Sequence, residues 1–198
     1  MGVAIREAEG NDRELIVRLL DDAFQNDPVS RWVFPGEEHR RTTHHRLMAA
    51  FTGIVLAEGR IDVTEDGSAC ALWLPISPGR HSTAEDPDGA ARLREAVDPG
   101  NERVERVARL MAEVHPVDRA HEYLWMIAVA PARQGEGLGT ALIREVIDRC
   151  DREGQPAYLE ASTARSAKLY ERLGFGFTNR AVDLPDGPRM WPMWREPR

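Results

Sequence analysis

Three glycines, Gly135, Gly137 and Gly139, alternate directly after a segment that is typical of a β-strand. Glycine lets the backbone approach a ligand more closely than a residue with a Cβ atom does. A helix is predicted to begin near Thr140, and a helix start offers unpaired N–H groups at the positive end of the helix dipole. Strand, glycine loop and helix start together indicate an anion site, most often for phosphate. The alternative interpretation is a flexible turn.

The glycine spacing excludes two common nucleotide-binding loops. It is Gly-x-Gly-x-Gly, and a dinucleotide-binding loop needs Gly-x-Gly-x-x-Gly. A P-loop needs Gly-Lys-Ser or Gly-Lys-Thr, and the only lysine of the chain is Lys168. The loop therefore predicts neither a Rossmann dehydrogenase nor a P-loop ATPase.

Composition narrows the class of protein further. The chain has 198 residues, 42% of them apolar, which fits one domain with a sizeable core. A net charge of −7 argues against nucleic-acid binding, and no apolar stretch is long enough for a membrane span. Cys70 and Cys150 are the only cysteines, so a disulfide scaffold and a cysteine-rich metal site are excluded. We expect a cytoplasmic monomer or homodimer without a metal.

Helices and strands alternate along the predicted chain, which indicates an α/β or α+β fold. Residues 25–35 contain two prolines and are predicted to end the first helix, and residues 75–100 are predicted to form a loop or a short broken helix. We expect one domain over 1–198, with a loop and helix insertion at 75–115. Strands are predicted over 3–8, 59–66, 68–74, 122–129, 157–161, 178–184 and 190–195, and helices over 12–24, 37–58, 101–114, 140–152 and 165–173.

Two motifs in the second half of the chain give a family resemblance. The run 134–139 (QGEGLG) matches a pyrophosphate-binding signature, Arg/Gln-x-x-Gly-x-Gly/Ala, and the run 170–175 (YERLGF) matches Tyr-x-x-x-Gly-Phe. In both respects the chain resembles the GCN5-related N-acetyltransferase (GNAT) superfamily. The resemblance implies a mixed central sheet of about six to seven strands, flanked by helices, with a V-shaped splay between the central strands. It also implies acetyl-CoA as the co-substrate.

The resemblance implies how the coenzyme binds. Backbone N–H groups of the glycine loop would hold the diphosphate, and the edge of the central strand would pair with the pantetheine arm. Glu136 departs from the usual basic or neutral residue, and we expect it to point to solvent near Arg133. Thr163 stands where many relatives have an asparagine. The predicted coenzyme-binding residues are Ile127, Ala128, Val129, Arg133, Gln134, Gly135, Glu136, Gly137, Leu138, Gly139, Thr140, Thr163 and Ser166.

Tyr170 matches the tyrosine that protonates the departing thiolate in the family, although a packed core tyrosine is the alternative. The base that removes a proton from the amine is open. Relatives often carry a glutamate or histidine on the central strand, where this chain has Tyr123 and Trp125. His121 lies on the same predicted strand face and has a suitable ordinary pKa. Glu160 and a chain of water molecules are the other candidates.

The predicted acceptor is a primary amine of a small molecule, with an antibiotic or an aminonucleoside among the candidates. Aromatic side chains could form a wall for a flat or cationic substrate, although core packing is their more common role. Two alternatives stay open: acetylation of protein or peptide N-termini, and a coenzyme-binding regulatory module without catalysis. The residues predicted to line the acceptor site are Trp32, Phe34, Tyr123 and Trp125.

Overall fold

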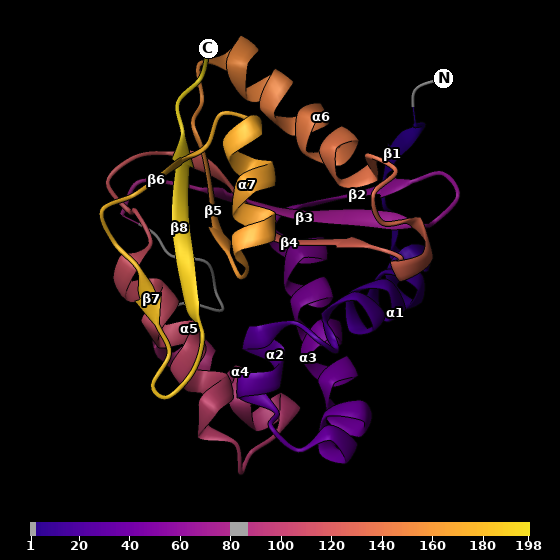
Figure 1. Cartoon of the computed structure of the whole chain (residues 1–198), viewed down its shortest axis with the longest axis vertical. Helices are drawn as coiled ribbons and strands as arrows, with labels where there is room; N and C mark the ends of the chain where they lie inside the picture. The colour runs from indigo at the N-terminus through magenta and orange to yellow at the C-terminus, as the bar shows by residue number, and fades with distance from the viewer. Residues whose placement is uncertain (1–2, 80–86) are drawn as a thin grey trace.

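The computed structural model describes residues 3–79 and 87–198, so residues 80–86 of the predicted insertion lie outside the described residues. Figure 1 shows the arrangement of the elements. The strands are β1 Ile5–Glu7, β2 Arg60–Thr64, β3 Ala69–Ile76, β4 His121–Val129, β5 Ala157–Ala161, β6 Gly176–Phe177, β7 Val182–Asp183 and β8 Arg189–Arg195. The helices are α1 Arg13–Phe24, α2 Pro28–Val33, α3 Glu37–Glu58, α4 Pro87–Val97, α5 Glu102–Val114, α6 Leu138–Glu153 and α7 Ala164–Arg172, with short 3-10 turns at Gly10–Asp12 and Pro131–Arg133.

One eight-stranded sheet runs through the molecule in the order β1-β2-β3-β4-β5-β8-β6, with β7 pairing to β8. All neighbours are antiparallel except β4 and β5, which are parallel. Helices α6 and α7 cover one face, and α1 to α5 lie toward the other (Figure 1). The expected mixed sheet is confirmed, with eight strands in place of six or seven. No helix among residues 3–79 and 87–198 is long and apolar enough to cross a bilayer.

The two central strands separate part of the way along. Parallel pairing of β4 with β5 begins at Glu122 and Ala157 and ends at Leu124 and Leu159. Residues 125–129 of β4 continue beyond that point, paired with β3 on their other edge. This is the expected V-shaped splay. It leaves backbone groups of β4 open along one edge.

A β-bulge marks the start of the splay. Leu72 pairs with Met126 and Trp73 pairs with Leu124, so Trp125 is the extra residue in β4. A bulge interrupts the alternation of side chains between the two faces. Trp125 and Met126 consequently both pack toward the helices α1 and α3. Side-chain directions predicted from simple alternation therefore hold only up to the bulge.

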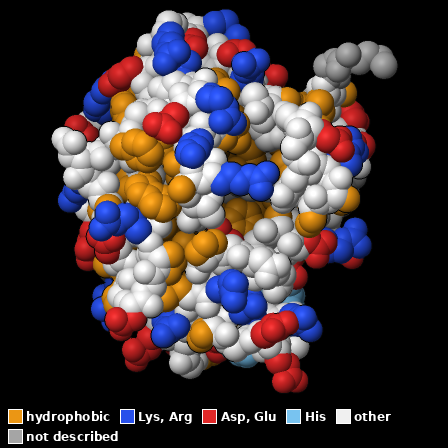
Figure 2. All heavy atoms as spheres, in the orientation of Figure 1, with side chains coloured by type: hydrophobic (Ala, Val, Ile, Leu, Met, Phe, Trp, Pro, Cys, Tyr) orange, Lys and Arg blue, Asp and Glu red, His pale blue; other side chains and the backbone are white. Residues whose placement is uncertain are grey.

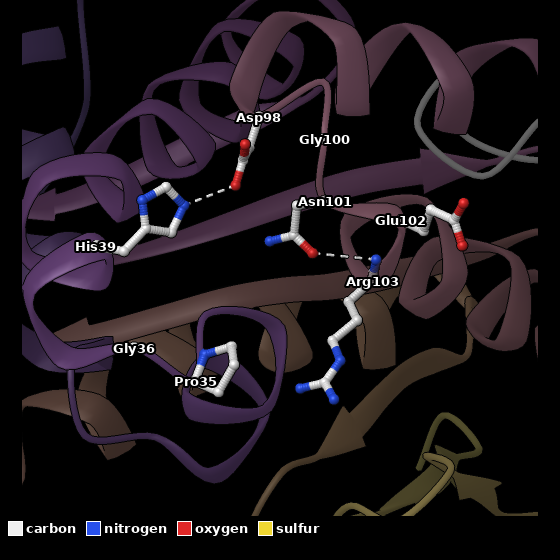
Figure 3. A pocket seen from close by; sticks show the side chains of 8 residues that line it. All are labelled: Pro35, Gly36, His39, Asp98, Gly100, Asn101, Glu102 and Arg103. Carbon is white, nitrogen blue, oxygen red and sulfur yellow. Dashed lines mark hydrogen bonds and ion pairs between the residues drawn. The ribbon is translucent and has the colours of Figure 1, made fainter.

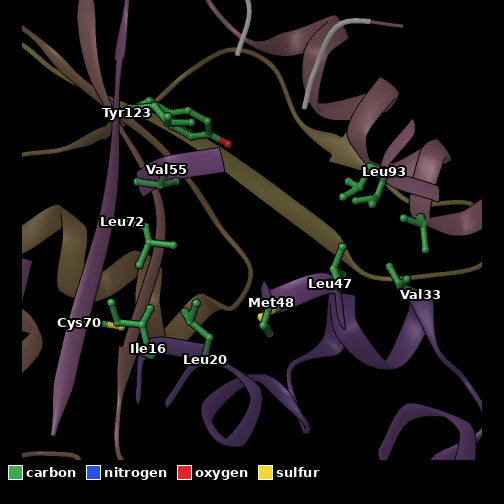
Figure 4. Packing of buried hydrophobic residues seen from close by; sticks show 14 of the residues in the cluster. Ile16, Leu20, Val33, Leu47, Met48, Val55, Cys70, Leu72, Leu93 and Tyr123 are labelled. Carbon is green, nitrogen blue, oxygen red and sulfur yellow. The ribbon is translucent and has the colours of Figure 1, made fainter. Parts of the chain in front are cut away.

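Two hydrophobic cores hold the helices on the sheet. The first packs α1 and α3 against β2, β3 and β4, with Ile16, Leu20 and Val55 fully buried beside Leu72 (Figure 4). The second packs α6 and α7 on the opposite face. Apolar burial is the main favourable contribution to folding. The two cores fix the sheet and thereby the site elements that leave its edges.

All five predicted helices agree with the structure to within two residues, and helix 37–58 and strand 157–161 agree at both ends. Residues 25–35 follow the end of the first helix, as predicted, but they also contain the helix α2, which was not predicted. Asp27 caps this helix, since its Oδ1 accepts from Val29 N at 2.8 Å and from Ser30 N at 3.4 Å. Proline at the first helical position, Pro28, is a familiar start signal after such a cap. Reading both prolines only as helix breakers missed it.

The predicted strand over 178–184 is only partly right, because it contains β7, which pairs with the start of β8, whereas β6 lies before residue 178 and pairs with the end of β8. Pro192 of β8 lies between the part paired with β6 and the part paired with β7. Its carbonyl oxygen accepts a hydrogen bond from Thr178 N at 2.9 Å, so its nitrogen faces the same neighbour. Proline has no N–H to donate, and the ladder cannot continue there.

Candidate functional site

The glycine loop has the backbone geometry that an anion site requires. Gly135 and Gly137 have φ angles of 89° and 85°, a region that side chains with a Cβ atom rarely adopt. A Cβ atom built on either glycine would have nothing within 4 Å, so this surface is open to a ligand. Gly137 is the N-cap of α6, and no side chain of the described residues caps this helix start. The loop therefore fits a diphosphate held by backbone N–H groups.

Arg133 is already paired, and it does not reach freely toward a ligand. Its Nε lies 2.7 Å from Glu136 Oε2, and its Nη1 lies 2.8 Å from Asp66 Oδ2. Glu136 and Asp66 share the one positive charge of Arg133, and the two pairs tie the loop to the β2–β3 turn. Gln134 donates from its side chain to the Val129 carbonyl at 3.4 Å. Both side chains thus shape the loop, and binding of an anion would rest on the backbone.

The outer half of β4 leads from the splay into this loop. Ile127 and Val129 point toward the start of α6, since a Cβ atom at Gly139 would lie 3.6 and 3.7 Å from their side chains. Ala128 is buried on the opposite face. The open backbone edge of these residues can accept an extended ligand as an added strand would pair.

Thr163 and Ser166 form the cap of α7. Thr163 Oγ1 accepts from Ser166 N at 3.1 Å, and Ser166 Oγ accepts from Thr163 N at 3.3 Å. This reciprocal capping box fixes the start of the helix that carries Tyr170. Their predicted contact with the coenzyme stays a prediction, and the structure shows that both hydroxyl groups already serve the helix.

Tyr170 lies on the inner face of α7 and is 7% exposed. Burial raises the pKa of its hydroxyl above the ordinary value, and the negative charge of Asp27 raises it further. The phenol therefore stays protonated at neutral pH, as a proton donor must. The Asp27 carboxylate therefore lies close enough for its charge to act on the Tyr170 hydroxyl.

Asp27 begins the segment 27–34 that the sequence suggested for the acceptor pocket, without a role of its own, and Ser162 was not predicted for any site. Asp27 Oδ2 accepts a hydrogen bond from Ser162 Oγ at 2.6 Å, across 135 positions of the chain. Ser162 directly follows β5, so this bond joins α2 to the strand end at the splay. The Asp-Pro helix start was the available signal for Asp27; no local signal marks Ser162.

Glu160 lies at the end of β5, two residues before Ser162. Its Oε2 accepts a hydrogen bond from the Tyr123 hydroxyl at 2.8 Å. Tyr123 is fully buried. The pair links β4 to β5 just where the two strands separate. Glu160 thus lies where β4 and β5 separate, and its hydrogen bond with Tyr123 helps to hold the two strands together.

His121 does not face an acceptor in this structure. It is fully buried, its Nδ1 donates to the Arg119 carbonyl at 2.9 Å, and its Nε2 lies 3.0 Å from Nε2 of His115. The rings of Tyr158 and Trp194 also pack against it. These contacts place His121 in the core and away from solvent, so its role as the base stays a prediction that no contact in this structure supports.

The four aromatic residues predicted to line the acceptor site do not form one wall. Phe34 and Tyr123 are fully buried, and Trp32 is 8% exposed. Trp32 Nε1 donates to the Pro185 carbonyl at 2.9 Å. Trp125 packs against Phe51 with the ring centres 4.5 Å apart. In this structure these side chains serve core packing, which corrects the predicted role of Trp32, Phe34 and Tyr123.

The molecular surface has two relevant hollows. The face carrying α7 is hollowed beside α7 and below α6, where hydrophobic side chains line the depression and a basic side chain lies across it (Figure 2). A second, open groove of about 580 Å³ lies between the starts of α3 and α5 (Figure 3). There His39 Nε2 and Asp98 Oδ2 are 2.8 Å apart. Its lining includes none of the predicted site residues.

Comparison with known proteins gives both a family match and a fold match. The model of the acetyltransferase (GNAT) family matches residues 86–175. An uncharacterized N-acetyltransferase of Schizosaccharomyces pombe is 29% identical over 189 residues, which cover 87% of this chain and 74% of the yeast protein. The sequence also resembles puromycin N-acetyltransferase over nearly its whole length. The comparisons give no specific support for that likeness.

The solved structures that resemble the whole chain include the following two. A Corynebacterium glutamicum protein described as histone acetyltransferase HPA2 and related acetyltransferase has a TM-score of 0.75 and 28% identity, covering 100% of this chain and 98% of the other. Arylalkylamine N-acetyltransferase 2 from Aedes aegypti has a TM-score of 0.66 and 15% identity, covering both chains fully. The chain has the GNAT fold, and residues 86–175 resemble the GNAT acetyltransferase family.

Proposed function

We propose that the protein transfers the acetyl group of acetyl-CoA to a primary amine of a small molecule. The observation that carries the proposal is the hydrogen bond from Ser162, at the end of β5, to Asp27, whose charge acts on Tyr170, beside an open glycine loop. A carboxylate for the amine and a protonated phenol for the leaving thiolate are the two groups that direct acetyl transfer needs.

In this proposal Asp27 and Tyr170 each carry out one of the two proton transfers. When bound, acetyl-CoA supplies a thioester carbonyl as the electrophile. Backbone N–H groups of β4 at 127–129 polarise that carbonyl oxygen. Asp27 binds the amine and accepts the proton that the nitrogen loses as its bond to carbon forms. Tyr170 donates its proton to the sulfur as the carbon–sulfur bond breaks, and it regains a proton afterwards from solvent.

A contact over the site favours a small acceptor over a peptide. Trp32 of α2 donates to the Pro185 carbonyl, and a Cβ atom at Gly187 would lie 2.3 Å from the Trp32 ring. The β7–β8 turn is therefore packed directly on α2. An extended peptide that crossed between them would have to break this contact. The fold shared with an arylalkylamine N-acetyltransferase is consistent with a small amine.

A panel of amines tests the reaction class. Wild-type protein is incubated with acetyl-CoA and phenethylamine, agmatine, an aminonucleoside or a peptide with a free N-terminus, and released thiol is measured. We expect release with at least one small amine and none with the peptide. Release with the peptide alone would make the protein a peptide acetyltransferase. Release with none of them would leave the coenzyme-binding module as the better description.

The substitution Gly137→Asp tests the placement of the coenzyme. At φ 85° a side chain is strained, and the new carboxylate would repel a diphosphate. We expect binding of coenzyme A, measured by calorimetry, to be abolished. Gly154→Asp is the matched control, because Gly154 has φ 70° at the other end of α6 with equally open surroundings. Equal affinity of the Gly137→Asp variant and wild type would contradict the placement.

The substitution Tyr170→Phe tests the proton donor. It keeps the buried ring and removes only the hydroxyl group. General acid catalysis is worth about 10²–10⁴-fold. We expect the single-turnover rate to fall by about 10²-fold while the Kd for coenzyme A changes little. An unchanged single-turnover rate would mean that Tyr170 is a packing residue.

The substitution Asp27→Asn tests the carboxylate. Asparagine is nearly the same size and can still accept the hydrogen bond from Val29 N. We expect kcat/KM for the amine to fall by about 10²-fold, because the proton acceptor is lost. The exposed neighbour Asp22 provides the control Asp22→Asn, which removes an equal charge nearby. Equal losses in both variants would point to long-range charge and away from Asp27 itself.

The same variant makes a prediction about pH. Asp27 raises the pKa of Tyr170, so its removal lowers that pKa, although burial continues to raise it. The rate falls as pH rises through the pKa of the proton donor. We therefore expect the alkaline limb of the single-turnover rate to move to lower pH in Asp27→Asn. A limb that stays in place would show that the two groups are not coupled.

A further inference from the structure

Three helices are joined by a buried hydrogen-bond chain that the proposed reaction does not use. His44 of α3 is fully buried. Its Nδ1 lies 2.6 Å from Asp21 Oδ1 of α1, and its Nε2 lies 3.0 Å from Ser30 Oγ of α2. Ser30 itself is 7% exposed. We call this the Asp21–His44–Ser30 chain.

The direction of each bond follows from the charge state of His44. Burial lowers the pKa of His44 and Arg40 lowers it further, although the carboxylates of Asp21 and Asp27 oppose this. His44 is therefore neutral at neutral pH. Asp21 accepts from Nδ1–H, so Nε2 carries the lone pair and Ser30 Oγ–H donates to it.

Helix α2 depends on such bonds because it is short. Six residues cannot hold a helix in water by their own hydrogen bonds. Neighbouring side chains bind its carbonyl groups: Arg103 Nη1 lies 2.7 Å from the Trp32 oxygen, and Asn101 Nδ2 lies 3.0 Å from the Val33 oxygen. Arg103 and Asn101 lie at the start of α5, as Figure 3 shows. In the first turn of α2, where Asp27 forms the cap, the Ser30 side chain makes the contact with the neighbouring helix α3.

We propose that Asp21, His44 and Ser30 are positioning residues that hold the first turn of α2 so that Asp27 faces Ser162 and the amine. The link is direct, since Ser30 N donates to Asp27 Oδ1 while Ser30 Oγ donates to His44. Without the chain, the first turn loses its attachment to α3 and Asp27 loses its fixed direction. The proposal rests on the role of Asp27 in the proposed function.

The first test needs no substrate. Hydrogen–deuterium exchange is followed at the amides of Arg31 and Phe34, which bond to the Asp27 and Ser30 carbonyls. Ser30→Ala leaves His44 Nε2 buried without its donor, a loss large enough to raise local opening about tenfold. Thr52→Val is the control, because it removes a buried hydroxyl of α3 that bonds only within the helix, to the Met48 carbonyl. We expect about tenfold faster exchange in Ser30→Ala and wild-type exchange in Thr52→Val.

The second test separates positioning from general stability. With the best amine of the panel, Ser30→Ala and Asp21→Ala should raise KM for the amine about tenfold, with the Kd for coenzyme A unchanged. Asp21→Asn keeps an acceptor for Nδ1–H of His44, so it should restore KM to near the wild-type value.

The outcomes separate the two proposals. Unchanged exchange in Ser30→Ala, or an Asp21→Asn variant as impaired as Asp21→Ala, would overturn the positioning role. Faster exchange combined with an unchanged KM for the amine would also overturn it, because α2 would then move without affecting the site. If wild type acetylates no amine, the proposed function fails and the role assigned through Asp27 fails with it, whereas the exchange data still report whether the chain holds α2.

Discussion

The separation of β4 from β5 after Leu124 and Leu159 is the constraint on which the rest of the site depends. Backbone N–H and C=O groups need hydrogen-bond partners, and beyond this point β4 pairs with a neighbouring strand of the described residues only on the β3 side. The open edge leads directly into the glycine loop and the start of α6. An extended ligand that pairs with this edge would thus carry an anionic end to the helix N-terminus without any change in the sheet.

Local sequence was enough to predict the elements that form the proposed coenzyme half of the site. The glycine loop, the helix after it and Tyr170 lie within about forty residues, and each has its own local signal. The amine half could not be predicted in this way. The bond between Asp27 and Ser162 joins distant segments, and it forms only because α2 packs over the end of β5. His121 shows the same limit, because alternation gave its face, whereas His115 and Trp194 decide its burial.

The proposed acid and base work in different surroundings. Tyr170 is buried, which favours the neutral phenol and keeps its proton in place until a thiolate can take it. Asp27 is partly exposed, and its carboxylate is held by backbone N–H groups and a hydroxyl group. Its charge in turn opposes ionisation of the tyrosine. The position of Asp27 therefore helps to keep Tyr170 protonated.

The contacts between α5 and α2 have an evolutionary consequence. Asn101 and Arg103 belong to the segment between β3 and β4, apart from the glycine loop and Tyr170, yet they bind the carbonyl groups of α2. Substitutions in this segment can therefore shift α2 slightly while the proposed proton donor on α7 and the glycine loop stay unchanged. A lineage could change which amines it accepts by drift at these supporting positions, with its chemistry preserved throughout.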